Sequence, residues 1–284
     1  MRRAPALLAI ALAPTALSCI QFNADCSQPV ADPSYTVTYL ASPVPVDHTV
    51  VRTQESALGD RMTDAFLKAL QDSGSPPDVA VDNAGDIRDL GLCVTRTELA
   101  KGPLTRAVLK DVIPFSDELV TVRVTVQELF HLLEHGVATL ATPGNHPGGQ
   151  FLQVSGLSYE VDCSKPAEQL STVGGNLVRT QDGQRVRSIT LASFEGEPNV
   201  TITRDEADSD AVGGDIVVAL SSYLGGGGDK FIDLDGKTMT KANPERYTYT
   251  VLEAYLHALH ATAGSPATLA VDPHHPRIVL KNCG

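Results

Sequence analysis

An apolar pentapeptide that runs into a glycine-rich segment is the feature that most restricts how this chain can fold. Residues 216–220 read IVVAL, and residues 223–231 read YLGGGGDKF. The apolar run is typical of a buried strand. Four glycines soon after it permit positive φ angles and close approach of the backbone to a neighbouring group. We interpret the segment as the rim of a binding site, with a mobile glycine linker as the alternative.

The two ends of the glycine run indicate what such a site would bind. Tyr223 offers a flat aromatic face, and Asp229 offers a hydrogen-bond acceptor. An aromatic face beside a fixed acceptor suits a planar heterocycle that carries N–H donors.

Helical and extended patterns alternate irregularly along the chain. A helix is predicted from Ser56 to the breaker SGSPP at 73–77, and a capping box at Thr125 and Glu128 predicts a second helix to Val137. Shorter helices are expected at 104–113 and from Pro244, and the acidic stretch 205–215 is expected to be solvated. Strands are predicted at 35–40, 78–81, 118–125, 152–161, 186–191, 212–220 and 277–280. This irregular order favours an α+β fold over a doubly wound sheet.

Five segments occur in the order found in the C-terminal, nucleotide-recognising domain of 5'-nucleotidases, which this chain resembles. Besides the glycine-rich segment, they are 52–59 (RTQESALG), 83–88 (NAGDIR), 112–115 (VIPF) and 149–156 (GQFLQVSG). The resemblance implies a four-layer α/β/β/α domain, which we place at residues 35–284.

The same resemblance implies a set of ligand-binding residues. Phe115 and Tyr223 correspond to the two aromatic residues that stack on the base, and Asp229 to the aspartate that contacts it. Asn83 corresponds to an asparagine near the sugar and phosphate, and Arg88 to a phosphate-binding arginine. Such stacking is worth roughly 1–3 kcal/mol per base, and arginine offers phosphate a planar fork of donors. A core position for Phe115 and a solvated surface position for Arg88 are the alternatives.

Several positions depart from the family pattern. Asp86 replaces a glycine near the expected phosphate, and Lys230 replaces a glycine of the base-binding loop. Gln54 stands where animal members carry another phosphate-binding arginine, and Arg52 is expected on the opposite face of an extended segment. These changes are expected to weaken phosphate binding more than base binding, which would favour nucleosides. A scaffold protein with a degenerate pocket is the alternative.

Hydrolytic members of the family carry a preceding metallophosphoesterase domain, in which two metal ions activate water. No stretch before residue 48 is long enough for such a domain. We therefore expect a nucleoside- or nucleotide-recognition domain that binds no metal cofactor and is inactive alone. The alternative is the substrate-binding half of a split hydrolase, whose two divalent metal ions would lie in a separate metallophosphoesterase chain.

Two further motifs indicate other chemistry. His131, Glu134 and His135 fit the H-x-x-E-H pattern of inverted zincins, but no third ligand is evident, so a polar helix face is favoured. Residues 233–236 (DLDG) resemble the aspartyl-phosphate loop of haloacid-dehalogenase phosphatases. Lys237 stands where that loop has threonine, so a tight turn is favoured.

The first residues predict export. Arg2 and Arg3 precede an apolar run at 6–12 that is too short to span a bilayer. Residues 16–19 (ALSC) resemble a bacterial lipobox. We expect a signal peptide at 1–18, lipidation of Cys19, a tether at 19–34 and an anchor in the bacterial cell envelope. Cleavage to a soluble exported form is the alternative.

Charge and cysteine content narrow the partners further. The formal net charge is −12, which opposes binding to the phosphate backbone of DNA or RNA because such binding depends on Lys and Arg. Cys26, Cys93, Cys163 and Cys283 match no zinc motif. In an oxidising compartment these four cysteines are consistent with two disulfides, whose pairing the sequence leaves open.

Overall fold

A computed structural model of the 284-residue chain describes residues 30–71, 76–89, 96–142, 146–194, 196–209 and 212–284. The expected signal peptide, the lipidation site Cys19 and two further cysteines, Cys26 and Cys93, lie outside the described residues. Within the described ranges, no helix combines the length and the apolar character needed to cross a membrane.

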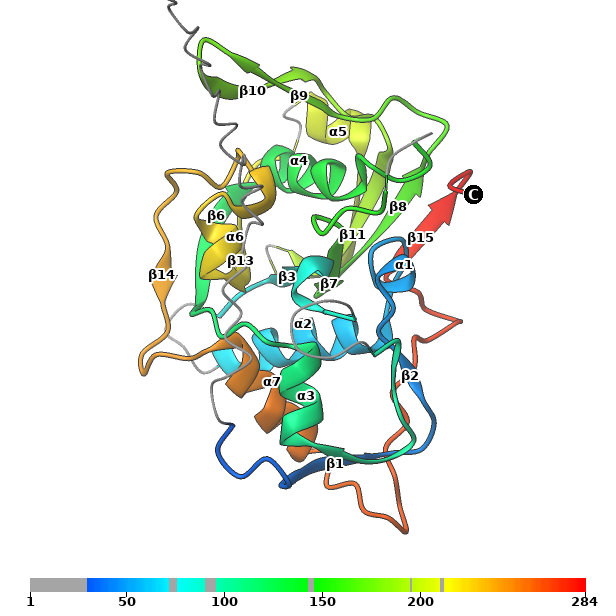
Figure 1. Cartoon of the computed structure of the whole chain (residues 1–284). Helices are drawn as coiled ribbons and strands as arrows, with labels where there is room; N and C mark the ends of the chain where they lie inside the picture. Colours follow the sequence, from blue (N-terminus) through cyan, green and yellow to red (C-terminus); the bar gives the residue numbers. More distant parts are fainter. Residues whose placement is uncertain (1–29, 72–75, 90–95, 143–145, 195, 210–211) are drawn as a thin grey trace, which may run out of the picture.

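One layer of the fold is a mixed five-stranded sheet (Figure 1). The apolar run 216–220 lies buried in β13, as expected. β13 runs parallel to β3 and antiparallel to β6, whereas β7 pairs antiparallel with β3. The strand order is β14 (Thr240–Lys241), β6 (Leu119–Thr125), β13 (Asp215–Ser221), β3 (Val79–Asn83) and β7 (Leu152–Ser155).

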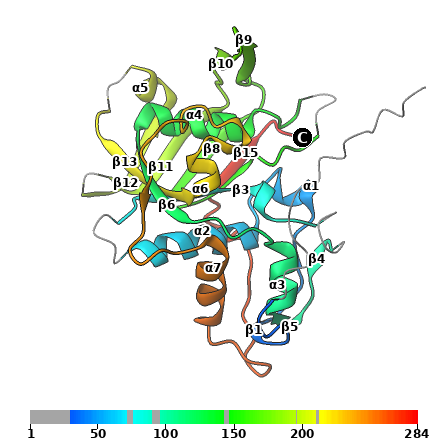
Figure 2. The same cartoon turned by 60° about the vertical axis from the view of Figure 1, so that its left-hand side comes forward.

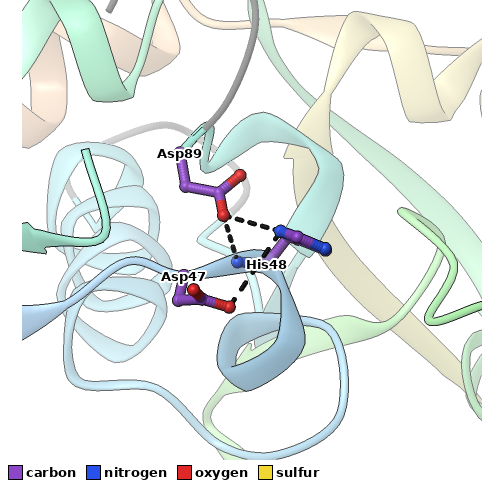
Figure 3. Close-up of side chains that lie close together, drawn as sticks. All are labelled: Asp47, His48 and Asp89. Atoms are coloured by element: carbon purple, nitrogen blue, oxygen red, sulfur yellow. Dashed lines mark hydrogen bonds and ion pairs between the residues drawn. The ribbon is translucent and has the colours of Figure 1, made fainter. Parts of the chain in front are cut away.

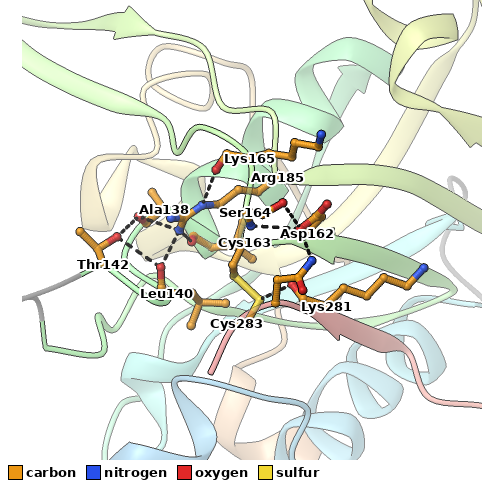
Figure 4. The surroundings of a disulfide bond; sticks show 12 residues. Ala138, Leu140, Thr142, Asp162, Cys163, Ser164, Lys165, Arg185, Lys281 and Cys283 are labelled. Carbon is orange, nitrogen blue, oxygen red and sulfur yellow. Dashed lines mark hydrogen bonds between the residues drawn. A yellow bond between two sulfur atoms is a disulfide. The ribbon is translucent and has the colours of Figure 1, made fainter.

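A second sheet of four strands contains the carboxyl-terminal strand. Its order is β12 (Glu197–Thr203), β11 (Val186–Phe194), β8 (Leu157–Asp162) and β15 (Ile278–Lys281). β15 pairs in parallel with β8. A disulfide joins Cys163 to Cys283 just beyond these two strands, with the Cα atoms 4.9 Å apart (Figure 4). Close by, Arg185 donates to the carbonyl oxygens of Val137 at 2.9 Å and Leu140 at 2.7 Å, where α4 ends.

Helices cover the sheets from two sides (Figures 1 and 2). On one side, α2 (Ala57–Leu70) packs on β3, β7 and β13 and against α7 (Thr248–His257). On the other side lie α4 (Val126–Val137) and α5 (Arg204–Asp208). The predicted capping box is present, since Thr125 and Glu128 exchange hydrogen bonds at 2.8 and 3.1 Å. The expected α+β class, with two sheets between helical layers, is confirmed.

Shorter elements complete the described chain. They are β1 (Thr36–Leu40) with β5 (Gly102–Thr105), β2 (Val44–Pro45) with β4 (Glu98–Leu99), and the helices α1 (His48–Val51), α3 (Arg106–Val112) and α6 (Ser222–Gly225). Two 3₁₀ turns, η1 (Ala84–Asp86) and η2 (Gly228–Lys230), follow β3 and α6.

Some elements differ from the sequence-based expectation. The single strand expected at 152–161 is two strands, because Gly156 turns the chain at φ 77°. The stretch 205–215 is mostly exposed where it is described, as expected, but it begins inside α5, whose first residue, Arg204, is buried. The hairpin of β9 (Gln169–Val173) and β10 (Asn176–Gln181) was not predicted; its residues are mostly exposed and show no apolar alternation.

Candidate functional site

The five motif segments meet around the carboxyl end of β3. Gly85 donates its N–H to the carbonyl oxygen of Gly149 at 2.9 Å, and Arg88 donates its N–H to that of Val112 at 2.8 Å. A β-carbon on Gly149 would lie 3.3 Å from the Gly85 Cα, so glycine permits this close approach. These bonds bring three segments together, and the remaining two join them through side chains.

Gln153 attaches segment 52–59 to the sheet. Its side-chain oxygen accepts the N–H of Ser56 at 3.0 Å. Its side-chain nitrogen donates to the carbonyl oxygens of Val51 and Gln54, each at 2.9 Å. A β-carbon on Gly59 would lie 2.4 Å from the Gln153 side chain, so the glycine at 59 makes room for it. The glutamine thus fixes the turn that precedes α2.

The glycine run is packed and is not a mobile linker. Gly227 takes a left-handed conformation at φ 79°. A β-carbon on Gly225 would lie 2.7 Å from the Met239 sulfur, and one on Gly228 would lie 2.7 Å from the Tyr223 ring. Each of these three glycines therefore meets a specific steric or backbone requirement.

Tyr223 and Asp229 hold each other at the mouth of this loop. The Tyr223 hydroxyl donates to Asp229 Oδ1 at 2.9 Å and accepts the Asp229 N–H at 3.1 Å. Asn83 donates its side-chain N–H to Asp229 Oδ2 at 2.9 Å. The Tyr223 side chain nevertheless remains 44% exposed, so a planar ligand can reach its ring. A fixed aromatic ring and a fixed carboxylate thus lie beside a buried amide.

Phe115 lies in the loop between α3 and β6 and is half-buried. The Val112–Arg88 hydrogen bond ties the start of this loop to the site. Within the described part of the chain, the rings of Phe115 and Tyr223 make no direct contact with each other. The two-ring clamp therefore stays a prediction.

Two arginines bring positive charge to the site. Arg88 is half-buried and donates to the carbonyl oxygen of Gly85 at 3.2 Å. Arg52 ends α1, and burial together with the charge of Arg88 lowers its pKa. Our placement of Arg52 on the far face of an extended segment was wrong, because 48–51 is helical and the chain turns after it. Gln54 is exposed, whereas Arg52 lies close enough to Arg88 for the two positive charges to interact.

A histidine–carboxylate contact holds α1 in place (Figure 3). Asp89 Oδ2 accepts the His48 backbone N–H at 2.8 Å and contacts His48 Nδ1 at 2.6 Å, while Asp47 caps α1 through the Thr49 N–H at 2.8 Å. Of the described residues, Asp47, His48 and Asp89 form the one group of three potential metal ligands within mutual reach. The Asp47 and Asp89 carboxylates already accept backbone N–H groups at the start of α1. We therefore interpret the group as a structural contact that stabilises this helix end.

Buried carboxyl groups lie beneath the site. Asp86 is 5% exposed; burial, reinforced by the charges of Asp117 and Asp229, raises its pKa to about 8. Asp82 is fully buried, and burial raises its pKa well above the ordinary range. Burial therefore favours the neutral form of Asp86, which repels an anion less than an ionised carboxylate does.

The H-x-x-E-H motif does not form a metal centre in the described structure. Glu134 accepts from the Arg204 guanidinium at 3.2 Å, His131 faces Asp233 at 3.4 Å, and His135 turns toward the glycine-rich loop. The motif lies on a polar face of α4, whose Glu134 and His135 are buried in these contacts. Burial raises the pKa of Glu134 to about 7.

Comparison with known proteins identifies the family that the chain is similar to. A family model described as 5'-nucleotidase, C-terminal domain matches residues 36–235. The trifunctional nucleotide phosphoesterase protein YfkN of Bacillus subtilis is 26% identical over 182 residues, which cover 64% of this chain and 10% of that protein. Protein 5NUC of Lutzomyia longipalpis is 26% identical over 217 residues, covering 74% and 33%. The chain thus spans at most a third of these curated relatives.

Solved structures show the same fold. A 5'-nucleotidase precursor from Thermus thermophilus superposes with a TM-score of 0.64 at 24% identity, covering 87% of this chain and 39% of that one. The NAD nucleotidase of Haemophilus influenzae superposes with a TM-score of 0.55 at 14% identity, covering 88% and 39%.

Proposed function

Because this chain belongs to the family of 5'-nucleotidase C-terminal domains, we propose that it binds a nucleoside or nucleotide at the carboxyl end of β3. Tyr223 would stack on the base, Asp229 would accept its N–H groups, and Phe115 would close over the other face. Asn83 and Arg88 would face the sugar and any phosphate. The Tyr223–Asp229 pair carries this proposal, because it presents an exposed ring and a carboxylate in fixed relative positions.

Calorimetry with adenosine tests the site directly. Substituting Tyr223→Ala removes the ring, so affinity is expected to fall about tenfold or more. Tyr255→Ala is the matched control, since Tyr255 is a half-buried tyrosine on α7 and makes none of the site's hydrogen bonds. Equal affinity in the Tyr223 variant, with the circular dichroism spectrum unchanged, would refute stacking on Tyr223.

We further propose that the chain recognises its ligand without hydrolysing it. Base and ribose contacts would supply most of the affinity, so adenosine would bind about as tightly as AMP. Arg88, whose charge acts on Asp86, would then contribute little net preference for the phosphate group. A phosphate-release assay with AMP, with and without divalent metal, should show binding without turnover. Metal-dependent release by the purified chain would contradict this part of the proposal.

A split hydrolase is the second candidate. The chain aligns with 39% of the Thermus structure, so a catalytic domain supplied by a separate metallophosphoesterase chain would complete the family's usual arrangement. Such a partner would dock where the bound phosphate is exposed. Purification of the tagged chain from its native envelope should then recover the partner together with AMP hydrolysis. Recovery of the chain alone, without that activity, would argue against a stable complex.

An exported, lipid-anchored location completes the proposal. The Cys163–Cys283 disulfide supports an oxidising compartment. Mass spectrometry of the amino-terminal peptide should show a diacylglyceryl group on Cys19, whereas an unmodified peptide beginning elsewhere would indicate the soluble exported form.

A further inference from the structure

His135 connects the loop of the candidate site to α4. One ring nitrogen, Nε2, lies 2.9 Å from the backbone carbonyl oxygen of Asp229. The other, Nδ1, lies 2.5 Å from Glu168 Oε2. His135 is 7% exposed, and the edge of its ring meets the Phe231 ring at a centroid distance of 4.7 Å. Packing and hydrogen bonding therefore leave this imidazole a single orientation.

Both partners of the ring are hydrogen-bond acceptors. A carbonyl oxygen and an ionised carboxylate can only accept, so each ring nitrogen needs its own proton. Arg179 donates to the second oxygen of Glu168 at 2.7 Å, which favours the ionised form of that carboxylate. The extra proton thus belongs on the ring, and the geometry describes His135 as an imidazolium.

The hydrogen bond from His135 reaches the Asp229 carbonyl oxygen in a part of the backbone with unfavourable φ angles. Asp229 and Lys230 adopt left-handed φ angles of 50° and 69°, a conformation that is unfavourable for residues other than glycine. Two such residues in sequence require external contacts to hold them. The Asp229 side chain in turn fixes the Tyr223 hydroxyl. We infer that protonated His135 is a positioning residue for the base-binding loop, so that ligand affinity depends on its proton.

Loss of that proton would remove one of the two bonds. A neutral imidazole has a single N–H. The charged acceptor Glu168 forms the stronger hydrogen bond, so the carbonyl of Asp229 would lose its donor. The left-handed turn would then relax, and the Tyr223 ring would lose its fixed position.

Apart from Glu168, the charged side chains around His135 form ion pairs or hydrogen bonds with residues other than His135. On α4, Glu134 pairs with Arg204, and His131 faces Asp233. On β10, Arg179 is shared between Glu168 and Asp233, with Asp182 at 3.9 Å. The Asp229 carboxylate accepts one hydrogen bond from Tyr223 and one from Asn83, which leaves further lone pairs for a ligand. Among the described residues, Glu168 is the carboxylate in hydrogen-bonding contact with the His135 ring.

Imidazole ¹⁵N spectra and adenosine binding, each measured across pH, together test this inference. The adenosine measurement rests on the proposed function, whereas the ¹⁵N measurement does not. Both nitrogens of His135 should carry protons at pH 6, and adenosine affinity should be about tenfold lower at a pH where the ¹⁵N shifts report a neutral ring. Substituting His135→Gln should weaken binding and remove that pH dependence. His257→Gln, on an exposed histidine that contacts Tyr35, is the matched control.

Substituting Glu168→Gln gives an independent test should His135→Gln fail to fold. A glutamine amide can donate to Nδ1 while a neutral ring still donates to Asp229, so this variant should bind adenosine with a flat pH profile. A neutral His135 at pH 6, or a pH dependence that persists in both variants, would overturn the inference. If the wild type binds no nucleoside at any pH, the proposed function fails. The ¹⁵N shifts of His135 and the pH response of the Tyr223 ring signals then still decide whether protonated His135 positions the loop.

Discussion

Gly228 and Tyr223 are packed so closely that a β-carbon at 228 would lie 2.7 Å from two ring carbons of the tyrosine. The Tyr223 ring therefore packs directly on the backbone of Gly228. Because Asp229 follows immediately and bonds the ring's hydroxyl, a short segment positions both groups that we expect to meet the base.

Gly228→Ala should displace the Tyr223 ring and reduce adenosine affinity about tenfold or more, since stacking on one ring contributes roughly 1–3 kcal/mol. Gly226→Ala is the control in the same loop, because a β-carbon there would make contacts no closer than 3.4 Å. Calorimetry on both variants separates the ring's position from general disturbance of the loop. Similar losses in both would show that the loop tolerates no side chain at all.

Asp86→Asn should flatten the pH dependence of stability. The folded state holds the Asp86 proton up to a pKa of about 8, whereas the unfolded chain releases it near the ordinary value of 3.8. Between these values the folded state binds more protons, so the free energy of unfolding falls as pH rises. Asparagine cannot titrate, so the decline from pH 5 to 8 should shrink by at least about 1 kcal/mol.

Urea unfolding at several pH values measures this effect. Asp272→Asn is the control, because Asp272 is exposed and its hydrogen bonds lower its pKa, which places its titration below this range. An unchanged decline in the Asp86 variant would mean that this carboxyl is ionised in the folded protein.

Arg204→Ala should strongly destabilise the fold. The Arg204 and Glu134 side chains are 2% and 1% exposed, and removal of the arginine leaves a carboxylate buried without its cation. The expected loss is about 3–5 kcal/mol. Lys241→Ala breaks the surface pair with Glu118, whose lysine side chain is 56% exposed, and should cost less than about 1 kcal/mol.

Replacing both members of the buried pair, Arg204→Met with Glu134→Leu, should recover much of the loss, because neither charge of the pair then remains without its partner. Chemical denaturation of Arg204→Met, Glu134→Leu and the double variant forms a complete cycle. A double variant no more stable than Arg204→Ala would show that packing by the arginine stem outweighs its charge.

Gln153→Ala should loosen the turn before α2. The substitution removes three hydrogen bonds and leaves the carbonyl oxygens of Val51 and Gln54 without their donor. A loss of about 2–4 kcal/mol in the free energy of unfolding is expected. Gln150→Ala, which removes one long contact of 3.5 Å to Thr139, should change stability by less than about 1 kcal/mol.

The same prediction has a local readout. Hydrogen exchange at the Ser56 amide should accelerate in the Gln153 variant and stay slow in the Gln150 variant. Protection of Ser56 in both would place the anchor of this turn elsewhere.

Much of the site was predictable because its chemistry is local in sequence. Tyr223 and Asp229 are separated by one glycine run, so their pairing follows from a short loop. The support under that loop was not predictable, because His135 reaches Asp229 across 94 positions and its histidine motif indicated only a polar helix face, with zinc ligation as the alternative. The altered pKa of Asp86 likewise depends on burial, which only tertiary packing determines.

The hairpin of β9 and β10 escaped prediction for a different reason. Its strands bury little, so they carry no apolar period, yet Arg179 on β10 bonds Glu168 beneath the site. The hairpin, which buries few residues, is therefore connected through Arg179 and Glu168 to the loop that we propose binds the base.

The Cys163–Cys283 bond also determines how the purified protein should be handled. β15 is the terminal strand of its sheet, and Cys283 secures its end to the residue that follows β8. In reducing buffer β15 could fray from that end, leaving the backbone N–H and C=O groups of β8 open to a strand from another molecule. Aggregation on reduction is therefore expected to begin at this sheet edge, remote in sequence from the glycine-rich loop.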